Sequence, residues 1–239
     1  MTDPVDARYP EPADRNEYGD CRRCPALVDC RERISWGVGP RDAMVTVVGE
    51  APGAGDPDAG TWKGGNWTGM AYTSRASGRK VRALVADLGY EGDAYYTNAV
   101  KCFPCERPDG DSGDSDGDSG GTDGDGPAAP AGATNREPTA AELANCRSYL
   151  LDEIGTVAPD WVLATGKHAT GSLFAVDGRE VGGFLDRVLE PVVLEGIDPP
   201  VLPLLHPSYQ EVWLSRLGHT RESYVGAIRA VLGAGAERR

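Results

Sequence analysis

Residues 44–53 read MVTVVGEAPG, an apolar, largely β-branched run that ends in glycine and continues into a loop rich in glycine and proline. A short apolar run bounded by turn residues is typical of a strand buried on both faces of a sheet. Glu50 follows the run directly, so a carboxylate stands at the carboxyl end of this strand. The stretch therefore predicts one strand of a parallel sheet, with the functional edge at its carboxyl end.

Strand-like and helix-like segments alternate along the rest of the chain. Thr139 and Glu142 have the spacing of a capping box, which marks a helix start. Repeated strand–helix units predict an α/β fold with a mainly parallel sheet covered by helices. The strands are expected at 95–100, 161–164 and 201–205, and the helices at 77–88, 139–154, 167–174 and 221–232.

The chain has 239 residues and a formal net charge of −13. This length predicts one domain with attachments, which we place at residues 21–232 with tails at 1–20 and 233–239. The acidic balance excludes nucleic-acid binders that rely on a basic surface. With no apolar run of about 18 residues and no apolar segment near the start, we expect a cytoplasmic protein without a membrane span.

The charged residues are unusual in kind. Only four of the 24 basic residues are lysines, and 22 of the 37 acidic residues are aspartates. Such a composition suits a protein dissolved in molar salt, so we predict a halophilic protein. Residues 109–132 hold seven aspartates, no basic residue and no core-forming side chain, which predicts a disordered acidic insertion.

Polar side chains or a glycine follow each predicted strand. Glu50 follows the first, Asn98 lies in the second, Gly166 follows the third and His206 follows the last. Because the carboxyl ends of parallel strands meet at one edge, these groups are expected to share a rim. A carboxylate, an amide and an imidazole together can recognise the edge of a base and stabilise charge on a departing group.

The six cysteines predict a metal centre, because thiols stay reduced in the cytosol. Cys21-x-x-Cys24 and Cys102-x-x-Cys105 have the spacing of a four-thiolate zinc site. Alternatively, Cys146 replaces Cys105 and four thiolates hold an iron–sulfur cluster. The spacing leaves both possibilities open.

Six segments of the chain match one known family: Cys21-x-x-Cys24, VVGEAPG at 47–53, TGMAY at 68–72, YYTNAVKCFP at 95–104, NREPTAAELANC at 135–146 and LLHPSYQ at 204–210. On these segments the chain resembles the family-four uracil-DNA glycosylases, the iron–sulfur branch of the uracil-DNA glycosylase superfamily. The resemblance covers about Cys21 to Leu232. GGNWTG at 64–69 also resembles the related family-five enzymes, which accept a broader range of deaminated bases, but their first motif lacks the carboxylate that Glu50 supplies here.

This resemblance implies a three-layer sandwich of the uracil-DNA glycosylase type, acting as a monomer on uracil-containing DNA in base excision repair. It also implies a structural 4Fe-4S cluster held by Cys21, Cys24, Cys102 and Cys146. The enzyme would flip the nucleotide out of the helix and hydrolyse its N-glycosidic bond. The implied catalytic residues are Glu50, His206 and Asp56, and the implied substrate-binding residues are Gly49, Ala51, Tyr72 and Asn98.

Individual roles follow from the chemistry of uracil release. Tyr72 would stack on the base, and the amide of Asn98 would pair with O4 and N3–H of uracil but not with cytosine. His206 would donate a hydrogen bond to the departing base at O2. Glu50 or Asp56 would orient a water and stabilise the oxocarbenium-like sugar.

In about 1 M salt the Debye length is about 3 Å, so DNA binding must rest on close contacts. We expect these from Arg75, Arg79, Lys80, Arg82, Lys101, Arg136 and Arg216. Two other functions fit the same residues. One is a non-catalytic, metal-stabilised module that binds DNA through Tyr72, Trp62 and Trp67, and the other is a zinc enzyme acting on a free nucleotide.

Overall fold

The computed structural model describes residues 14–58, 64–73, 77–106 and 134–236. The predicted insertion at 109–132, Trp62 and Arg75 lie outside these ranges. Domain contacts begin before Cys21, because Asn16 is buried and its backbone N–H donates to the carbonyl of Gly37. No helix in the described part of the chain is long and apolar enough to cross a membrane.

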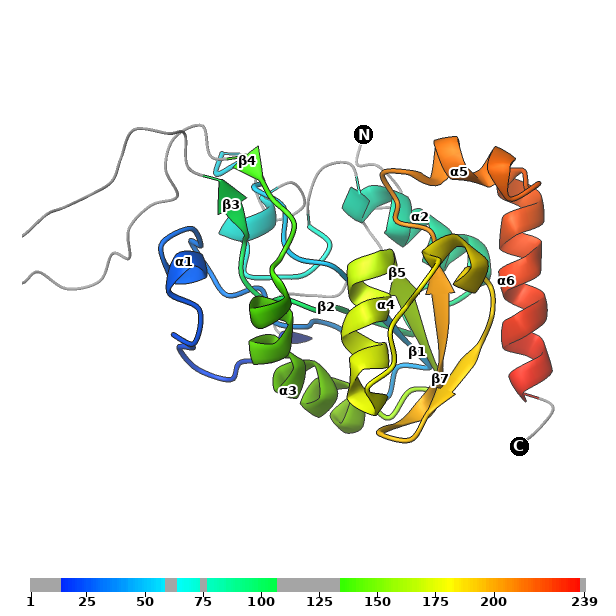
Figure 1. Cartoon of the computed structure of the whole chain (residues 1–239), viewed down its shortest axis with the longest axis horizontal. Coiled ribbons are helices and arrows are strands. Elements are labelled where there is room, and N and C mark those ends of the chain that lie inside the picture. The colour runs from blue at the N-terminus through cyan, green and yellow to red at the C-terminus, as the bar shows by residue number, and fades with distance from the viewer. Residues whose placement is uncertain (1–13, 59–63, 74–76, 107–133, 237–239) are drawn as a thin grey trace, which may run out of the picture.

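A five-stranded sheet forms the centre of the molecule, in the order β2-β1-β5-β7-β6 (Figure 1). Neighbouring pairs among the first four strands in this order are parallel, and only β6 runs antiparallel to its neighbour. The predicted mainly parallel sheet is therefore confirmed. The strands are β1 (Val45–Gly49), β2 (Ala94–Asn98), β5 (Trp161–Thr165), β6 (Val192–Leu194) and β7 (Ile197–Leu204).

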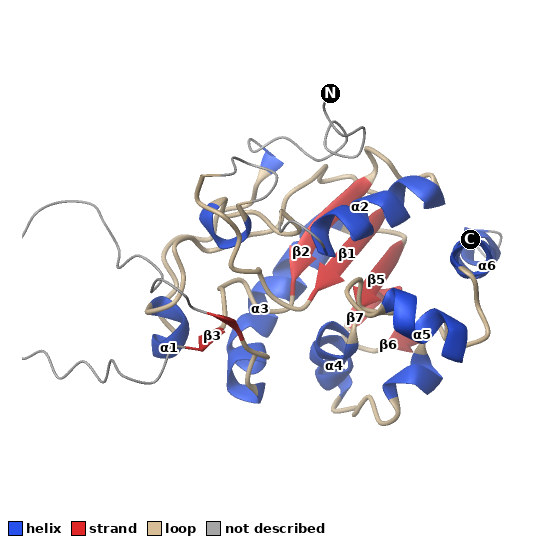
Figure 2. Ribbon diagram, turned by 90° about the horizontal axis from the view of Figure 1, so that it is seen from above, coloured by secondary structure: helices blue, strands red, loops and turns tan. Residues whose placement is uncertain are grey.

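Helices cover both faces of this sheet, which gives the predicted three layers (Figures 1 and 2). Val45 and Val47 of β1 pack with α2 and α6 on one face, whereas Val48 packs with α3 and α4 on the other. This alternation follows from the two-residue period of a strand. The four helices are α2 (Ser77–Leu88), α3 (Ala140–Val157), α4 (Lys167–Phe174) and α6 (Arg221–Ala236).

The capping box predicted at Thr139 is present. The Thr139 hydroxyl accepts the backbone N–H of Glu142 at 3.2 Å, and the Glu142 carboxylate accepts the backbone N–H of Thr139 at 2.8 Å. These two bonds satisfy donors that the first turn of a helix leaves free. The first turn of α3 is thereby fixed, and α3 carries Cys146 and Glu153 into the interior.

The chain between α4 and α6 differs from the prediction. The last strand begins at Ile197, four residues earlier than expected, and pairs with the unpredicted strand β6. Pro199 and Pro200 lie where the register between these strands shifts, a place where proline is tolerated in a sheet. This part of the chain also holds three helices that were not predicted, α5 (Gln210–Arg216) and the short helices η4 (Ala175–Asp177) and η5 (Phe184–Arg187). Outside it, the short helix η3 (Gly65–Trp67) was not predicted either.

A small lobe lies at the end of the molecule farthest from α6 (Figure 2). It holds α1 (Pro25–Val28) and the antiparallel pair β3 (Cys105–Glu106) and β4 (Thr134–Asn135). A disulfide joins Cys30 to Cys105, with their Cα atoms 5.8 Å apart. The prediction that the cysteines form no disulfide is therefore wrong for this pair.

Deleting residues 109–132 and joining the ends with a short Gly-Ser linker should leave stability in high salt near that of the intact protein. The deleted segment lacks core-forming residues, and the β3–β4 pairing already holds Glu106 opposite Thr134. Thermal unfolding of the two proteins provides the comparison. If the shortened protein melts at a clearly lower temperature, the insertion is not the passive segment we predict.

Candidate active site

The four parallel strands end at one edge of the sheet, and a narrow cavity of about 30 Å³ opens there. Glu50 follows β1, Asn98 ends β2, Thr165 ends β5 and His206 follows β7. All four line the cavity, together with Gly49, Ala51 and Tyr72. The structure thus brings the carboxylate, the amide and the imidazole together, as the sequence predicts.

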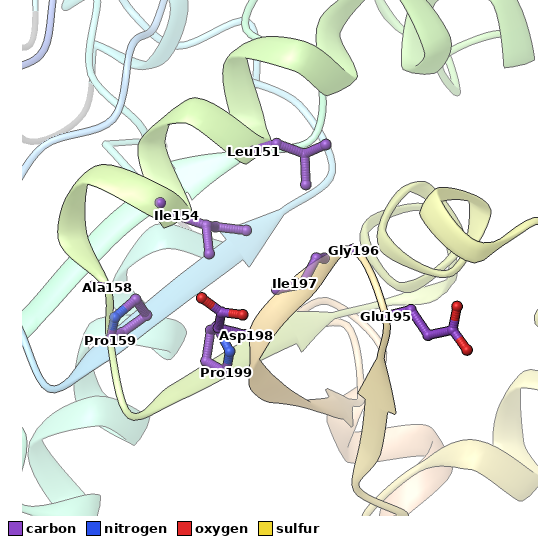
Figure 3. Close-up of a pocket in the computed structure, with 10 residues that line it drawn as sticks. Leu151, Ile154, Ala158, Pro159, Glu195, Gly196, Ile197, Asp198 and Pro199 are labelled. Atoms are coloured by element: carbon purple, nitrogen blue, oxygen red, sulfur yellow. The ribbon is translucent and has the colours of Figure 1, made fainter.

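A larger cavity of about 360 Å³ lies near the opposite edge of the sheet (Figure 3). It opens between the end of α3 and the turn from β6 to β7, and its walls are Leu151, Ile154 and the prolines Pro159 and Pro199. Its acidic groups, Glu195 and Asp198, are exposed to solvent. We assign the active site to the narrower cavity, because there buried polar groups converge from several strands.

Asn98 is held close against Gly49. A Cβ atom at position 49 would lie 2.4 Å from Oδ1 of Asn98 and 2.8 Å from the hydroxyl of Tyr72, so only glycine fits between them. Asn98 is 2% exposed, and its Nδ2 has no hydrogen-bond partner among the described residues. A buried amide donor without a protein partner is costly, so this group is a candidate for binding a ligand or a water.

His206 lines the same cavity as Asn98 and packs over Gly166. A Cβ atom at Gly166 would lie 3.1 Å from Cβ of His206, and Gly166 has a positive φ of 93° that favours glycine. Burial lowers the pKa of His206, and a charge on His168 lowers it further. The backbone N–H of Ser208 donates to Nδ1 of His206 at 3.3 Å. The neutral imidazole therefore carries its proton on Nε2, where it can serve as a donor.

Tyr72 has a positive φ of 57°, an uncommon backbone conformation for a bulky residue. Several contacts fix it. Its hydroxyl lies 2.7 Å from Oγ1 of Thr165, its carbonyl accepts a hydrogen bond from Arg82, and its ring meets Tyr96 edge-on with centroids 5.8 Å apart. Strained residues that are held this firmly occur preferentially at functional sites.

Glu50 is half-buried in the cavity wall. Burial raises the pKa of its carboxyl, a charge on His168 lowers it, and Glu137 raises it. Nε2 of His168 in turn lies 3.3 Å from the carboxylate of Glu137. The carboxylate of Glu50 thus belongs to a small group of titratable side chains at the start of α4.

Two residues at this site were not predicted from the sequence: Thr165, which lines the cavity, and His168, which affects the pKa of Glu50. Each lies within two residues of Gly166, at the carboxyl end of β5. The rule that directed attention to Glu50 and Asn98 also applies to this strand end. Inspecting the residues on both sides of Gly166 would therefore have found them.

Asp56 is not brought into the cavity. It is exposed, and its carboxylate accepts the backbone N–H of Asp58 at 3.0 Å in a local turn. The other predicted residues of the site line the cavity, so Glu50 is the carboxylate placed for chemistry there.

Two of the predicted phosphate contacts are wrong. Lys101 is buried, and its ammonium bonds to Glu153, Thr97 and the backbone of Asn98. Arg82 is also buried and holds the carbonyl of Tyr72. Basic residues reach DNA only from the surface, and the sequence alone did not distinguish these two from exposed ones.

Four cysteines remain outside the disulfide: Cys21, Cys24, Cys102 and Cys146. Cys102 and Cys146 are buried in one cluster with Leu27 and Val100, against which Cys24 packs. Electrostatic coupling links Cys102 to Cys146 and Cys21, and Cys146 to Cys24 and Cys21. The four thiols therefore gather between α1, the segment after β2, and α3.

Hydrogen-bond donors surround these four thiols. Arg31 donates to Cys102 Sγ at 3.3 Å, and Asn145 donates to Cys24 Sγ at 3.3 Å. Tyr149 hydrogen-bonds Cys21, and the backbone N–H of Lys101 donates to Cys146. Burial raises the pKa of Cys102 to about 12 and also raises that of Cys146, so neither resembles an activated nucleophile.

Four thiols are a donor set that iron–sulfur clusters use, and zinc is also held by four thiolates. The described residues contain no group of three or more His, Cys, Asp or Glu side chains that could hold a metal ion. The paired-CxxC zinc site is wrong for this structure, since Cys105 is bonded to Cys30.

Comparison with known proteins agrees with this fold. A family profile described as the uracil DNA glycosylase superfamily matches residues 36–231. The chain therefore belongs to the uracil-DNA glycosylase superfamily, which confirms the resemblance found in the sequence.

Three curated relatives carry the name type-4 uracil-DNA glycosylase. The protein of Thermotoga maritima is 29% identical over 191 residues, covering 79% of this chain and 77% of that protein. The protein of Archaeoglobus fulgidus is 27% identical and covers 80% and 78%. The protein of Pyrobaculum aerophilum is 28% identical and covers 67% and 62%.

Proposed function

We propose that this protein is a type-4 uracil-DNA glycosylase, which hydrolyses the N-glycosidic bond of deoxyuridine in DNA and so begins base excision repair. Superfamily membership and the names of the three relatives support this function. The observation that carries it is the buried amide of Asn98, whose Nδ2 has no partner among the described residues, on a cavity rim shared with His206 and Glu50.

The Asn98 amide supplies selectivity for uracil. Uracil presents an acceptor at O4 and a donor at N3–H, which match Nδ2 and Oδ1 of one amide. Cytosine presents an amino donor at the position of O4, so it would face the amide N–H groups with another donor. Tyr72, whose ring is fixed beside Gly49, offers a surface on which the flipped base stacks.

His206 stabilises the departing base. As the glycosidic bond breaks, negative charge grows on O2 of uracil. The proton on Nε2 of the neutral imidazole can be donated in a hydrogen bond to that oxygen, since Nδ1 already accepts from Ser208. A preorganised donor of this kind acts mainly on the transition state.

Glu50 assists the sugar side of the reaction. The bond breaks with oxocarbenium character, so a nearby carboxylate stabilises the positive charge and orients the attacking water. We assign this role to Glu50 because Asp56 lies outside the cavity.

We also propose that Cys21, Cys24, Cys102 and Cys146 hold a 4Fe-4S cluster. When bound, the cluster supplies a structural link among α1, the segment after β2, and α3, and no redox step. Ala51 of the active-site loop packs against the same group of residues. The cysteines therefore support the loop that carries Glu50.

The surface beside His206 is suited to close contact with DNA. Tyr209 is 59% exposed and Val212 is 56% exposed, and the Tyr209 ring lies 5.7 Å from that of His206. Arg216 lies over the ring of Trp213 on the same helix. For an acidic protein in high salt, apolar and stacking contacts of this kind are screened far less than charge attraction.

The test uses a labelled single-stranded oligonucleotide with one uracil and matched oligonucleotides with thymine or cytosine in its place. The enzyme should release free uracil and leave an alkali-labile abasic site only in the first. Tight binding to all three without uracil release would instead identify a binding module and refute the glycosylase.

As the pH is lowered, the enzyme should lose activity at a higher pH than it would with a glutamate of ordinary pKa. Burial raises the pKa of Glu50, so the carboxylate becomes neutral at a higher pH as the pH falls and then no longer stabilises the sugar cation. Glu50→Gln should lower the single-turnover rate by about 100-fold and flatten this acid limb. A variant that keeps the wild-type acid limb would show that another group, such as His206, titrates there.

A further inference from the structure

A buried ion pair contacts the backbone of Asn98, the residue proposed to recognise the base. The side chains of Lys101 and Glu153 are 1% and 0% exposed, and Nζ lies 2.6 Å from Oε2. Burying two charges is unfavourable unless their remaining hydrogen-bonding capacity is also satisfied. The partners of this pair therefore indicate what it does.

The ammonium of Lys101 makes three short contacts. Nζ donates to Oε2 of Glu153, to Oγ1 of Thr97 at 2.5 Å and to the carbonyl of Asn98 at 2.7 Å. An ammonium has three donors, so all of them are used inside the protein. The carbonyl of Asn98 thereby gains a charged donor at the point where β2 ends.

Glu153 fixes the other side of the pair. It comes from α3, and its Oε1 accepts the backbone N–H of Gly37 at 2.8 Å. Its Oε2 also accepts the hydroxyl of Thr97 at 2.5 Å. The pair therefore links the end of β2 to α3 and to the segment around Gly37.

The amide nitrogen of Asn98 has no hydrogen-bond partner among the described residues, so it does not fix the orientation of the side chain. Its backbone is fixed instead. The two following N–H groups, of Ala99 and Val100, donate to the carbonyls of Gly49 and Glu50 at 2.8 and 2.9 Å. Lys101 in turn donates to the carbonyl of Asn98 itself.

We propose that Lys101 and Glu153 are positioning residues that aim the amide of Asn98 at the base, an inference that rests on the function proposed above. Their charges hold the carbonyl of Asn98 at the end of β2 and so keep its carboxamide in place against Gly49 in the cavity wall. An apolar pair of the same size would fill the space but would leave the Asn98 carbonyl without its donor.

The test removes both charges together. Lys101→Met alone leaves Glu153 buried and unpaired, which is expected to destabilise the fold. The double variant Lys101→Met/Glu153→Gln avoids this, because glutamine keeps an acceptor for Gly37. The control is Asp87→Asn/Arg221→Met, which removes an ion pair between α2 and α6 away from the cavity. All variants are compared at equal visible absorbance and after thermal unfolding.

The double variant should release uracil about 10-fold to 100-fold more slowly than wild type in single turnover, while the control should stay close to wild type. In an Asn98→Ala background the same double change should lower the rate of uracil release by no more than about twofold, because the amide that the ion pair positions is absent. An equal loss in both backgrounds would mean that the pair acts only on the fold and would overturn the proposal.

A crystal structure of the double variant gives a readout that does not depend on activity. The carboxamide of Asn98 should leave its place against Gly49, and an unmoved carboxamide would overturn the proposal. If wild-type protein releases no uracil, the proposed function fails, and this structure alone decides whether the pair positions Asn98.

Discussion

His206→Ala should lower single-turnover uracil release by about 100-fold or more while leaving thermal unfolding close to that of wild type. We propose that this imidazole, which lines the cavity and accepts the backbone N–H of Ser208 at Nδ1, donates from Nε2 to O2 of the departing base. Asn98→Ala should have an effect of similar size, because the base then loses the amide that aligns it. Rapid-quench measurement of uracil release with enzyme in excess gives the rates.

His219→Ala is the matched control for the first variant. His219 lies between α5 and α6, where its Nδ1 is 3.1 Å from Oγ of Ser223, and it does not line the cavity. Its removal should leave the rate close to wild type. Wild-type rates in both His206→Ala and Asn98→Ala would refute the assignment of the active site.

The sequence predicted the parts of the fold that local patterns determine. The bounds of α2 and α4 match the prediction, since apolar spacing and neighbouring glycines define both helices. The rim was predictable because Glu50, Asn98 and His206 each stand at or just after the end of a strand. Neither inference required knowledge of which residues meet across the fold.

The missed features all depend on distant contacts or on burial. Pro199 and Pro200 obscured the start of β7, because a proline is tolerated there only through the shifted pairing with β6. Cys30 and Cys105 are 75 residues apart, and no local pattern pairs them. Lys101 resembles a surface cation in sequence, and its role appears only once Glu153 of α3 is placed beside it.

Serine in place of Cys21, Cys24, Cys102 or Cys146 should remove the visible absorbance of the purified protein and lower its melting temperature. Each change deletes one of the four thiolates, so the proposed cluster loses a ligand and the link among α1, the segment after β2, and α3 is lost. Iron and acid-labile sulfide content, the visible spectrum and thermal unfolding give the result for each variant.

The disulfide cysteines provide the matched control, because they lie in the same lobe and receive the same chemical change. Cys30→Ser and Cys105→Ser should keep the absorbance and the activity. They should lose only the stability that a disulfide closing such a long loop provides, up to about 4 kcal/mol. Treating wild type with a mild reductant that spares the cluster should reproduce this loss without bleaching.

The two sets of cysteines therefore separate metal binding from general stability. If loss of absorbance simply followed loss of stability, Cys105→Ser would bleach as readily as Cys146→Ser. Bleaching confined to the four unpaired cysteines requires that these thiolates, and not the lobe as a whole, hold the iron. The opposite pattern, with metal lost in Cys105→Ser and kept in Cys146→Ser, would restore the paired-CxxC zinc site and refute the proposed cluster.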